Sequence, residues 1–338
     1  MIQRRRAVVL AAAVTVVAAC TSQGSPSPEP GSQGPSAAAS SSSEPAASFV
    51  SDARTLRTIA GTPMASSQLT VGAEVGRNDV YTSHAATYTS DGLTISAVLH
   101  QPLAPGPHPG VVLVHGFVDP ASYVSGGELQ REQDYLARGR YVVLVPDLRG
   151  LAGSDPAPVG PPDLDMGSTV DVFNAISALA TSALVGLDGE RIGLMGHSLG
   201  GELVLNVLAA NPGFVDAAVV FAPSSTDAWA NVQQFLAPGD PFYQEIVAAY
   251  GTPETNATYW ADISAATFVS QVSEPLLVVH GDADADVPFE WSQDLAASWQ
   301  AAGKDVEFLT LPGENHVFEA RWNEAMDAVK AFFSRKLQ

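Results

Sequence analysis

Short apolar runs alternate with helical patterns from about residue 81 onward, and this alternation is the strongest constraint on the fold. Residues 110–115 read Gly-Val-Val-Leu-Val-His, a β-branched run typical of a strand that is buried on both faces. Strands that alternate with helices predict an α/β fold with a mostly parallel central sheet and helices on both faces. We predict strands at 94–99, 110–115, 141–145, 191–195, 217–221, 276–280 and 306–311, and helices at 128–138, 168–184, 199–210, 291–302 and 319–336.

The first residues of the chain have the organisation of an export signal. Arginines occupy positions 4–6, an apolar stretch covers 7–17, and the sequence Val-Ala-Ala-Cys ends at Cys20. The apolar stretch is too short to span a bilayer comfortably, and Val-Ala-Ala-Cys resembles a bacterial lipobox. We therefore predict a lipoprotein signal peptide at 1–19 and an exported protein that is lipid-anchored at the bacterial cell surface through Cys20. The alternatives are an ordinary signal peptide cleaved near Ala19, a free buried cysteine, and twin-arginine export.

The rest of the chain divides by composition. Residues 20–50 are rich in Ser, Pro, Gly and Ala, and such a stretch buries too little apolar surface to offset its ordering entropy. We predict a disordered tether there, then an N-terminal extension at 51–80 and the main folded domain at 81–338. Cys20 is the one cysteine, which excludes an intramolecular disulfide and a cysteine-based zinc site.

An aromatic-rich insert is expected at 224–272, between two predicted strands. This position predicts that it lies over the carboxyl edge of the sheet, where α/β proteins bind ligands. The insert is then a small lid or an acyl-binding wall, or it is a satellite core that packs on the domain. The candidate substrate-binding residues in it are Trp229, Phe235, Tyr259 and Trp260.

The charge of the chain excludes some partners. The formal net charge is −20 at pH 7. Phosphate binding requires clustered Lys and Arg, so nucleic acid is excluded as a partner. A basic membrane-binding patch is disfavoured for the same reason, which leaves the lipid anchor at Cys20 as the expected membrane contact. The sequence indicates no oligomeric state.

The sharpest chemical motif is Gly-His-Ser-Leu-Gly-Gly at 196–201, which follows a predicted strand and opens a predicted helix. A serine hydroxyl is a poor nucleophile, so it must be exposed and placed beside a base. A tight strand-to-helix turn exposes Ser198, and the glycines on either side allow the turn to close. We predict that Ser198 is a catalytic nucleophile; the alternative is a helix-capping serine.

The base of such a site follows the nucleophile in chain order and lies after the last strand. His316 is the one histidine that follows the last predicted strand, and it lies in a loop. We predict that His316 is the general base; the alternative is a surface loop histidine. The other histidines precede the core sheet, end strands or lie inside the elbow: His84, His100, His108, His115, His197 and His280.

The acid that orients the histidine should lie after the strand at 276–280. Three carboxylates follow that strand, and the chemistry alone does not choose among Asp282, Asp284 and Asp286. Asp227 is a further candidate. Clustered acids can also bind calcium, but this loop lacks the spacing and terminal glutamate of an EF-hand.

The oxyanion formed during acyl transfer needs two N–H donors. One is expected from Leu199, which follows the nucleophile. The second is expected from the backbone N–H of Phe117, because Gly116 permits a close approach after the strand at 110–115. The alternative for Gly116 is a simple strand-ending turn.

Three segments together resemble the catalytic domain of prolyl-oligopeptidase-type and dienelactone-hydrolase-like α/β-hydrolases. They are 107–117, the elbow at 196–201, and the loop at 280–288 with its partner at 313–316. The resemblance covers about residues 87–335 and implies the α/β-hydrolase fold. It also implies that Asp284 is the acid and His316 the base.

Some positions depart from the family pattern. Ala152 and Asn315 each replace a common glycine. The resemblance further implies that Asp147 and Arg149 form a structural pair without a catalytic role. We find no propeller domain in the sequence, and in the large peptidases of this family that domain restricts access to short peptides. This favours esters over peptides as substrates.

We therefore predict a serine hydrolase that cleaves carboxylic esters through an acyl-enzyme on Ser198, with no metal or organic cofactor. The expected partner is a small-molecule ester or a short peptide. A prolyl-oligopeptidase-type peptidase, a thioesterase and a lactonase remain alternatives, because fold and triad do not select the acyl substrate. A catalytically inactive anchored binding protein is the alternative from another class.

Overall fold

The computed structural model describes residues 49–51, 53–62 and 67–338. The predicted signal peptide, Cys20 and nearly all of the predicted tether lie outside these residues. Within the part that is described, no helix combines the length and the apolar character that crossing a bilayer requires.

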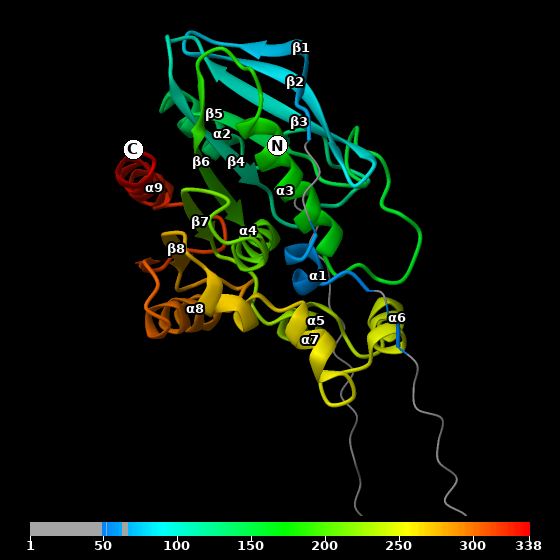
Figure 1. Cartoon of the computed structure of the whole chain (residues 1–338). Coiled ribbons are helices and arrows are strands. Elements are labelled where there is room, and N and C mark those ends of the chain that lie inside the picture. Colours follow the sequence, from blue (N-terminus) through cyan, green and yellow to red (C-terminus); the bar gives the residue numbers. More distant parts are fainter. Residues whose placement is uncertain (1–48, 52, 63–66) are drawn as a thin grey trace, which may run out of the picture. The chain divides into compact units, whose positions relative to one another are not determined.

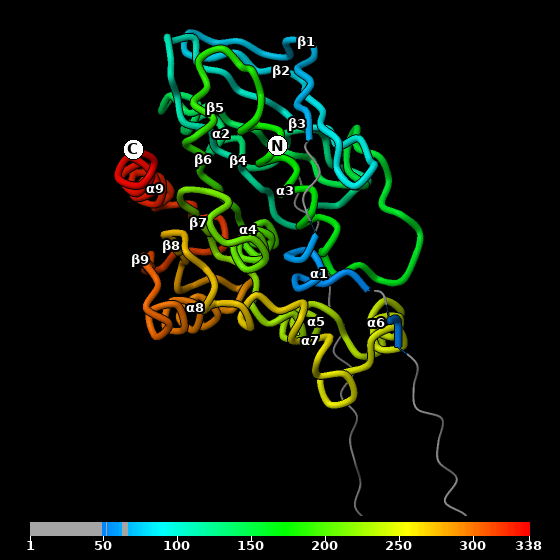
Figure 2. Tube along the Cα trace, in the orientation of Figure 1, coloured from blue at the N-terminus to red at the C-terminus, as the bar shows by residue number. Residues whose placement is uncertain are grey.

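The described residues form one mixed sheet in the order β1-β2-β3-β5-β4-β6-β7-β8-β9 (Figure 1), and Figure 2 shows its connections as a trace. Pairing is antiparallel from β1 to β5 and parallel from β5 to β9. The predicted mostly parallel sheet is confirmed. The bounds are β1 Thr70–Arg77, β2 Tyr81–Ser90, β3 Leu93–Pro102, β4 His108–Val114, β5 Val142–Pro146, β6 Leu187–His197, β7 Ala217–Phe221, β8 Leu276–Gly281 and β9 Val306–Leu311.

Helices cover both faces of this sheet, as predicted, because side chains alternate along each strand. Val112 and Leu144 point to one apolar core, and Val111 and Val143 point to the other. The first core includes residues of α3 Met166–Ala180, α4 Leu199–Ala210 and α8 Phe289–Ala301, and the second those of α2 Gln130–Arg138 and α9 Trp322–Lys336.

Strands β1 and β2 were not predicted from the sequence. β2 pairs with β3 in a hairpin whose turn is Asp91-Gly92, with φ of 53° and 80°. Asp-Gly is typical of a two-residue hairpin turn with positive φ at both positions, so this dipeptide is the signal by which the sequence indicates the hairpin. β1 is almost entirely exposed, so it has no alternating apolar pattern that could reveal it.

The segment before β1 contains a short helix, α1 Leu56–Ala60. Its Leu56 and Ile59 side chains are buried in the first core. Between β7 and β8 the chain forms four short helices, drawn in yellow-green to yellow in Figure 1: α5 Ala228–Phe235, α6 Pro241–Tyr250, α7 Ala257–Asp262 and the 3₁₀ helix Ala265–Gln271.

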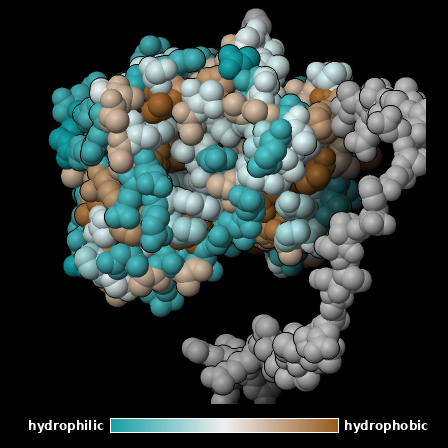
Figure 3. Space-filling model, turned by 90° about the horizontal axis from the view of Figure 1, so that it is seen from below, coloured by the Kyte–Doolittle hydropathy of each residue, from teal (hydrophilic) through white to brown (hydrophobic). Residues whose placement is uncertain are grey.

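The surface of the insert carries two exposed aromatic residues, Phe235 and Phe242. In the view from below, apolar groups stand apart from one another among hydrophilic ones (Figure 3). Isolated apolar side chains of this kind are ordinary on a folded protein and mark no interface by themselves.

Candidate active site

Ser198 lies at a sharp turn between β6 and α4, with φ 57° and ψ −123°. This conformation is unfavourable for a residue with a side chain, typically by about 1–3 kcal/mol. The neighbouring backbone holds it there. The Ser198 N–H donates to the Phe221 carbonyl at 2.9 Å, and the Ser198 carbonyl accepts from Gly201 and Ser224.

The glycines of the elbow are required by close backbone contacts. A Cβ added to Gly196 would lie 2.2 Å from the Gly200 carbonyl oxygen, and one added to Gly200 would lie 2.3 Å from the Val114 carbonyl oxygen. A side chain at Gly196 would therefore open the turn, and one at Gly200 would push the start of α4 away from the end of β4. The nucleophile elbow expected from the motif is present in the backbone.

The structure brings His316 against Asp284. His316 Nδ1 lies 2.7 Å from Asp284 Oδ2, and the Asp284 side chain is fully buried. The imidazole Nδ1–H donates to the carboxylate, so Nε2 is left for another partner. A histidine that serves as a general base needs this arrangement, because the carboxylate selects the tautomer and orients the ring.

The Asp284 carboxylate is held as an anion by several donors. Burial by itself would raise its pKa, but hydrogen bonds from His280, His316 and the N–H groups of Val287 and Asp286 hold the pKa well below its usual range. The carboxylate is therefore ionised at neutral pH. An ionised carboxylate at this distance can stabilise a positive charge on the His316 ring.

The other carboxylates that the sequence offered lie elsewhere. Asp282 Oδ1 accepts the Gly313 N–H at 2.6 Å and braces the two loops. Asp227 caps α5 by accepting the Trp229 N–H at 2.9 Å. Asp286 is exposed. One of its oxygens, an Asp284 oxygen and a His316 ring nitrogen lie within 4.8 Å of one another, close enough to be considered as ligands of a metal ion. Since Asp284 Oδ2 already accepts the His316 proton, this group is better described as a hydrogen-bonded acid–base cluster.

Two histidines contribute to the site in ways that the sequence analysis missed. His197 Nε2 donates to the His316 carbonyl at 2.9 Å, and the two rings lie 4.5 Å apart. His280 Nε2 lies 2.9 Å from the same Asp284 oxygen that His316 contacts. The sequence signal was their position at strand ends, beside the elbow and before the acidic loop.

The two predicted oxyanion donors belong to the residue after Ser198 and to the loop after β4. Within the described part of the chain, neither the Phe117 N–H nor the Leu199 N–H donates to another backbone group. A Cβ added to Gly116 would lie 3.0 Å from Ser198 Cβ and 3.6 Å from its Oγ, so the loop after β4 closely approaches the nucleophile. The Phe117 ring points to solvent, with 83% of its surface exposed.

The loop after β4 is anchored by Asp147, at the end of β5. The buried Asp147 carboxylate accepts from the Tyr123 hydroxyl at 2.8 Å and from further donors of that loop. The expected pair of Asp147 with Arg149 was wrong: Arg149 Nη2 instead lies 2.8 Å from Asp171 on α3. Leu148, with φ 65°, turns the chain between them and directs the two side chains apart.

The four aromatic candidates of the insert occupy different environments. Tyr259 and Trp260 are buried in the first core, and the Trp260 Nε1–H donates to the Gly251 carbonyl. Trp229 is half-buried, with its ring 4.6 Å from that of Trp260. Phe235 is 51% exposed and stands edge-on to Trp291 of α8 at 6.1 Å. The insert thus contains a small aromatic core that continues into the domain.

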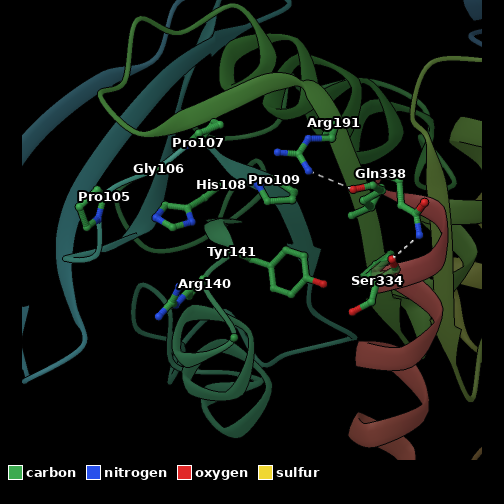
Figure 4. Close-up of a pocket in the computed structure, with 13 residues that line it drawn as sticks. Pro105, Gly106, Pro107, His108, Pro109, Arg140, Tyr141, Arg191, Ser334 and Gln338 are labelled. Atoms are coloured by element: carbon green, nitrogen blue, oxygen red, sulfur yellow. Dashed lines mark hydrogen bonds between the residues drawn. The ribbon is translucent and has the colours of Figure 1, made fainter.

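Two pockets lie at opposite ends of the strands. One of about 210 Å³ is lined by His197, Val317 and Phe318 among others, beside the His316 loop. A larger one of about 440 Å³ lies at the amino ends of β4 and β5, where Arg140 and Tyr141 line it (Figure 4). Ligands of open α/β sheets bind at the carboxyl ends, so the larger pocket lies outside the site.

The sequence model of the prolyl oligopeptidase family matches residues 128–338, more than half of the chain. Dipeptidyl peptidase 4 from Sus scrofa is 30% identical over 152 residues, which are 44% of this chain and only 18% of that protein. The uncharacterized peptidase YtmA from Bacillus subtilis (strain 168) is 24% identical over 242 residues, 70% of this chain and 86% of that one.

Solved structures with the same fold include esterases and a peptidase. Acetyl xylan esterase 1 from Thermoanaerobacterium sp. JW/SL YS485 has a TM-score of 0.61 at 18% identity, covering 80% of this chain and 89% of that chain. Est1E from Butyrivibrio proteoclasticus, with ferulic acid bound, has a TM-score of 0.57 at 21% identity, covering 74% and 98%. An acylaminoacyl peptidase has a TM-score of 0.63 at 20% identity, covering 77% and 42%. The sheet, the elbow and the family match agree, and the chain belongs to the prolyl oligopeptidase family as a serine hydrolase of the α/β-hydrolase fold, an esterase or a peptidase.

Proposed function

We propose that the protein hydrolyses carboxylic esters through an acyl-enzyme on Ser198. His316 Nε2 removes the Ser198 proton as Oγ attacks the ester carbonyl carbon, and Asp284 stabilises the resulting imidazolium. The N–H groups of Leu199 and Phe117 stabilise the oxyanion. His316 then protonates the departing alcohol oxygen, and a water molecule, activated by the same ring, hydrolyses the acyl-enzyme.

One observation carries this proposal: the buried Asp284 carboxylate is 2.7 Å from His316 Nδ1, in a structure that also presents Ser198 on a strained elbow. Burial of the acid makes the interaction strong, because little water competes for the carboxylate. The strained turn exposes the Ser198 hydroxyl, and it makes no evident contribution to the packing of the core.

The preference for esters rests on the relatives that match over most of their length. Est1E and acetyl xylan esterase 1 are covered over 98% and 89% of their chains. The acylaminoacyl peptidase is covered over 42% and dipeptidyl peptidase 4 over 18%. Peptide hydrolysis is the second candidate, favoured by the likeness to the uncharacterized peptidase YtmA over 86% of that protein.

The nucleophile is tested with a fluorophosphonate probe, which reacts with an activated serine. We expect covalent labelling of the wild type and none of Ser198→Ala. The control is Ser225→Ala, a serine of the segment after β7. Labelling that persists in Ser198→Ala would place the nucleophile elsewhere, and an unlabelled wild type would contradict a hydrolase.

The acid is tested by a matched pair of substitutions in one loop. Asp284→Asn should lower kcat by about 10⁴-fold, because the amide favours the wrong histidine tautomer. Asp286→Asn removes a charge two positions away and should change kcat by less than about tenfold. Equal losses in the two variants would show that the loop acts through its net charge, and a larger loss in Asp286→Asn would transfer the role of the acid to that residue.

The substrate class is tested with p-nitrophenyl esters of increasing acyl length against aminoacyl and prolyl p-nitroanilides. Esters are intrinsically more reactive, so each rate is divided by the uncatalysed hydrolysis rate before comparison. We expect the larger acceleration for the esters. A larger acceleration for the anilides would make the protein a peptidase.

The predicted location follows from residues outside the described part of the chain. We expect fatty-acid incorporation at Cys20 and recovery of the protein in the membrane fraction. Metabolic labelling with an alkynyl fatty acid checks this, with Cys20→Ser as the control. Release of unmodified wild-type protein into the medium would favour an ordinary signal peptide.

A further inference from the structure

His280 is a second histidine on the oxygen that orients His316. It lies near the end of β8 and is fully buried. Its Nε2 is 2.9 Å from Asp284 Oδ2, and His316 Nδ1 is 2.7 Å from that same atom. One carboxylate oxygen therefore accepts from two imidazoles.

The position of the His280 ring is itself set by α8. His280 Nδ1 lies 2.7 Å from the Ser292 hydroxyl, which is also fully buried, and the Phe289 ring stands edge-on to the imidazole at 5.5 Å. A carboxylate can only accept, so Nε2 donates to Asp284. In the neutral imidazole Nδ1 then accepts the Ser292 proton, which selects this tautomer.

The second Asp284 oxygen is occupied as well. Oδ1 accepts the N–H of Asp286 at 2.8 Å and that of Val287 at 3.0 Å. With its four donors the carboxylate cannot rotate without breaking hydrogen bonds, and its side chain has no solvent contact through which water could replace them. His280 is the one side-chain donor among them besides the base itself.

We propose that His280, held by Ser292, is a positioning residue for Asp284: it locks the carboxylate toward His316 and shares the charge of the oxygen that both histidines contact. This inference rests on the proposed function. Two consequences follow from the loss of the His280 donor. The carboxylate is no longer fixed, which slows proton transfer, and Oδ2 keeps more negative charge for its bond to His316.

Three other polar groups lie near His316. Asp286 is on the loop beside it, the His197 ring lies 4.5 Å from the His316 ring, and the Glu314 carboxylate in the His316 loop accepts the Ala320 N–H. In the described part of the chain, no hydrogen bond joins any of them to His280. A variant at His280 therefore changes the donor to Asp284 and leaves these charges as they are.

The test compares His280→Leu, which fills the space without a donor, with His280→Gln, whose amide N–H can reach the same oxygen. We expect His280→Leu to slow fluorophosphonate labelling about 10-fold to 100-fold. In the pH profile of the labelling rate, the acid limb, where the rate rises with pH, should move to higher pH by about half a unit to one unit. His280→Gln should restore most of the rate, and Ser292→Ala should give a smaller loss.

The matched control is His100→Leu on β3, a buried histidine that also has two polar partners, Ser83 and Gln133. It should lower stability without moving the acid limb. If His280→Leu shows wild-type labelling and limb, or if His280→Gln loses as much as His280→Leu with no shift of the limb, the proposal is wrong. If His280→Leu fails to fold, the pH profile of Ser292→Ala decides. A wild-type labelling rate with an unshifted acid limb in Ser292→Ala would also contradict the proposal.

A readout without turnover separates this inference from the proposed function. The downfield ¹H NMR signal of His316 Nδ1–H reports its bond to Asp284, and we expect it to shift in His280→Leu and Ser292→Ala. An unlabelled wild type would refute the hydrolase, whereas an unshifted proton signal would refute the role of His280.

Discussion

The half-buried elbow histidine His197 makes the free energy of unfolding depend on pH. Burial, and then the charge that develops on neighbouring His316, lower the pKa of His197 to about 4. An imidazole in an unfolded chain has a pKa of about 6.5, and each unit corresponds to about 1.4 kcal/mol. The difference predicts that His197 alone removes about 3 kcal/mol of folding free energy when the pH falls from 7 to below 4.

The sign follows from proton binding. Between the two pKa values the unfolded chain binds the proton and the folded chain does not, so acid favours unfolding. The contribution is complete above about pH 6.5 and is lost as the pH falls toward 4. His197→Gln removes the titration and retains an N–H that can reach the His316 carbonyl.

The assay is urea unfolding of the wild type and His197→Gln at about pH 7 and about pH 4, with half-buried His84→Gln as the control. The loss of unfolding free energy on acidification should be about 3 kcal/mol smaller in His197→Gln than in the wild type. His84→Gln should follow the wild type more closely. Parallel losses in wild type and His197→Gln would refute the reasoning.

Three further outcomes are expected. Gly116→Ala places a Cβ 3.0 Å from Ser198 Cβ, so kcat/KM in steady-state ester hydrolysis should fall about 10-fold to 100-fold, and an unchanged value would show that the loop yields freely. Arg149→Ala leaves buried Asp171 without its cation, so urea unfolding should show a loss of about 3–5 kcal/mol, and a loss below about 1 kcal/mol would contradict the importance of this pair. Burial and a neighbouring carboxyl raise the pKa of Glu202, which makes the folded state bind its proton and lose stability as the pH rises. Glu202→Gln should remove part of that loss between about pH 4 and pH 8 in the same assay, whereas an identical pH dependence would exclude a buried neutral Glu202.

The predictable parts of the fold are those in which the local pattern of apolar residues matches their burial in the folded protein. The run at 110–115 is apolar on both sides because β4 is covered on both faces, and the structure places that strand at His108–Val114. β1 is an edge strand with an exposed surface on both sides, so its residues obey no such pattern. It is recognisable only through its pairing with β2.

The site shows the same division. The elbow around Ser198 is only partly local. Gly196 is required by the Gly200 carbonyl four residues further on, whereas Gly200 is required by the Val114 carbonyl of the neighbouring strand β4. The partners of a buried charge are not local. Arg149 lies two residues from Asp147 but pairs with Asp171, because Leu148 turns the chain and α3 supplies the carboxylate.

The sequence alone was enough to predict the fold class and the glycine-flanked elbow at Ser198, since these depend on strand patterns and on backbone sterics. Which atoms surround Asp284 was decided by packing. His280, Ser292 and His316 come from β8, α8 and the last loop, and they meet at one carboxylate only when the sheet and its helices are assembled. Hydrogen bonds act over about 3 Å in space irrespective of separation along the chain, so no local pattern records them.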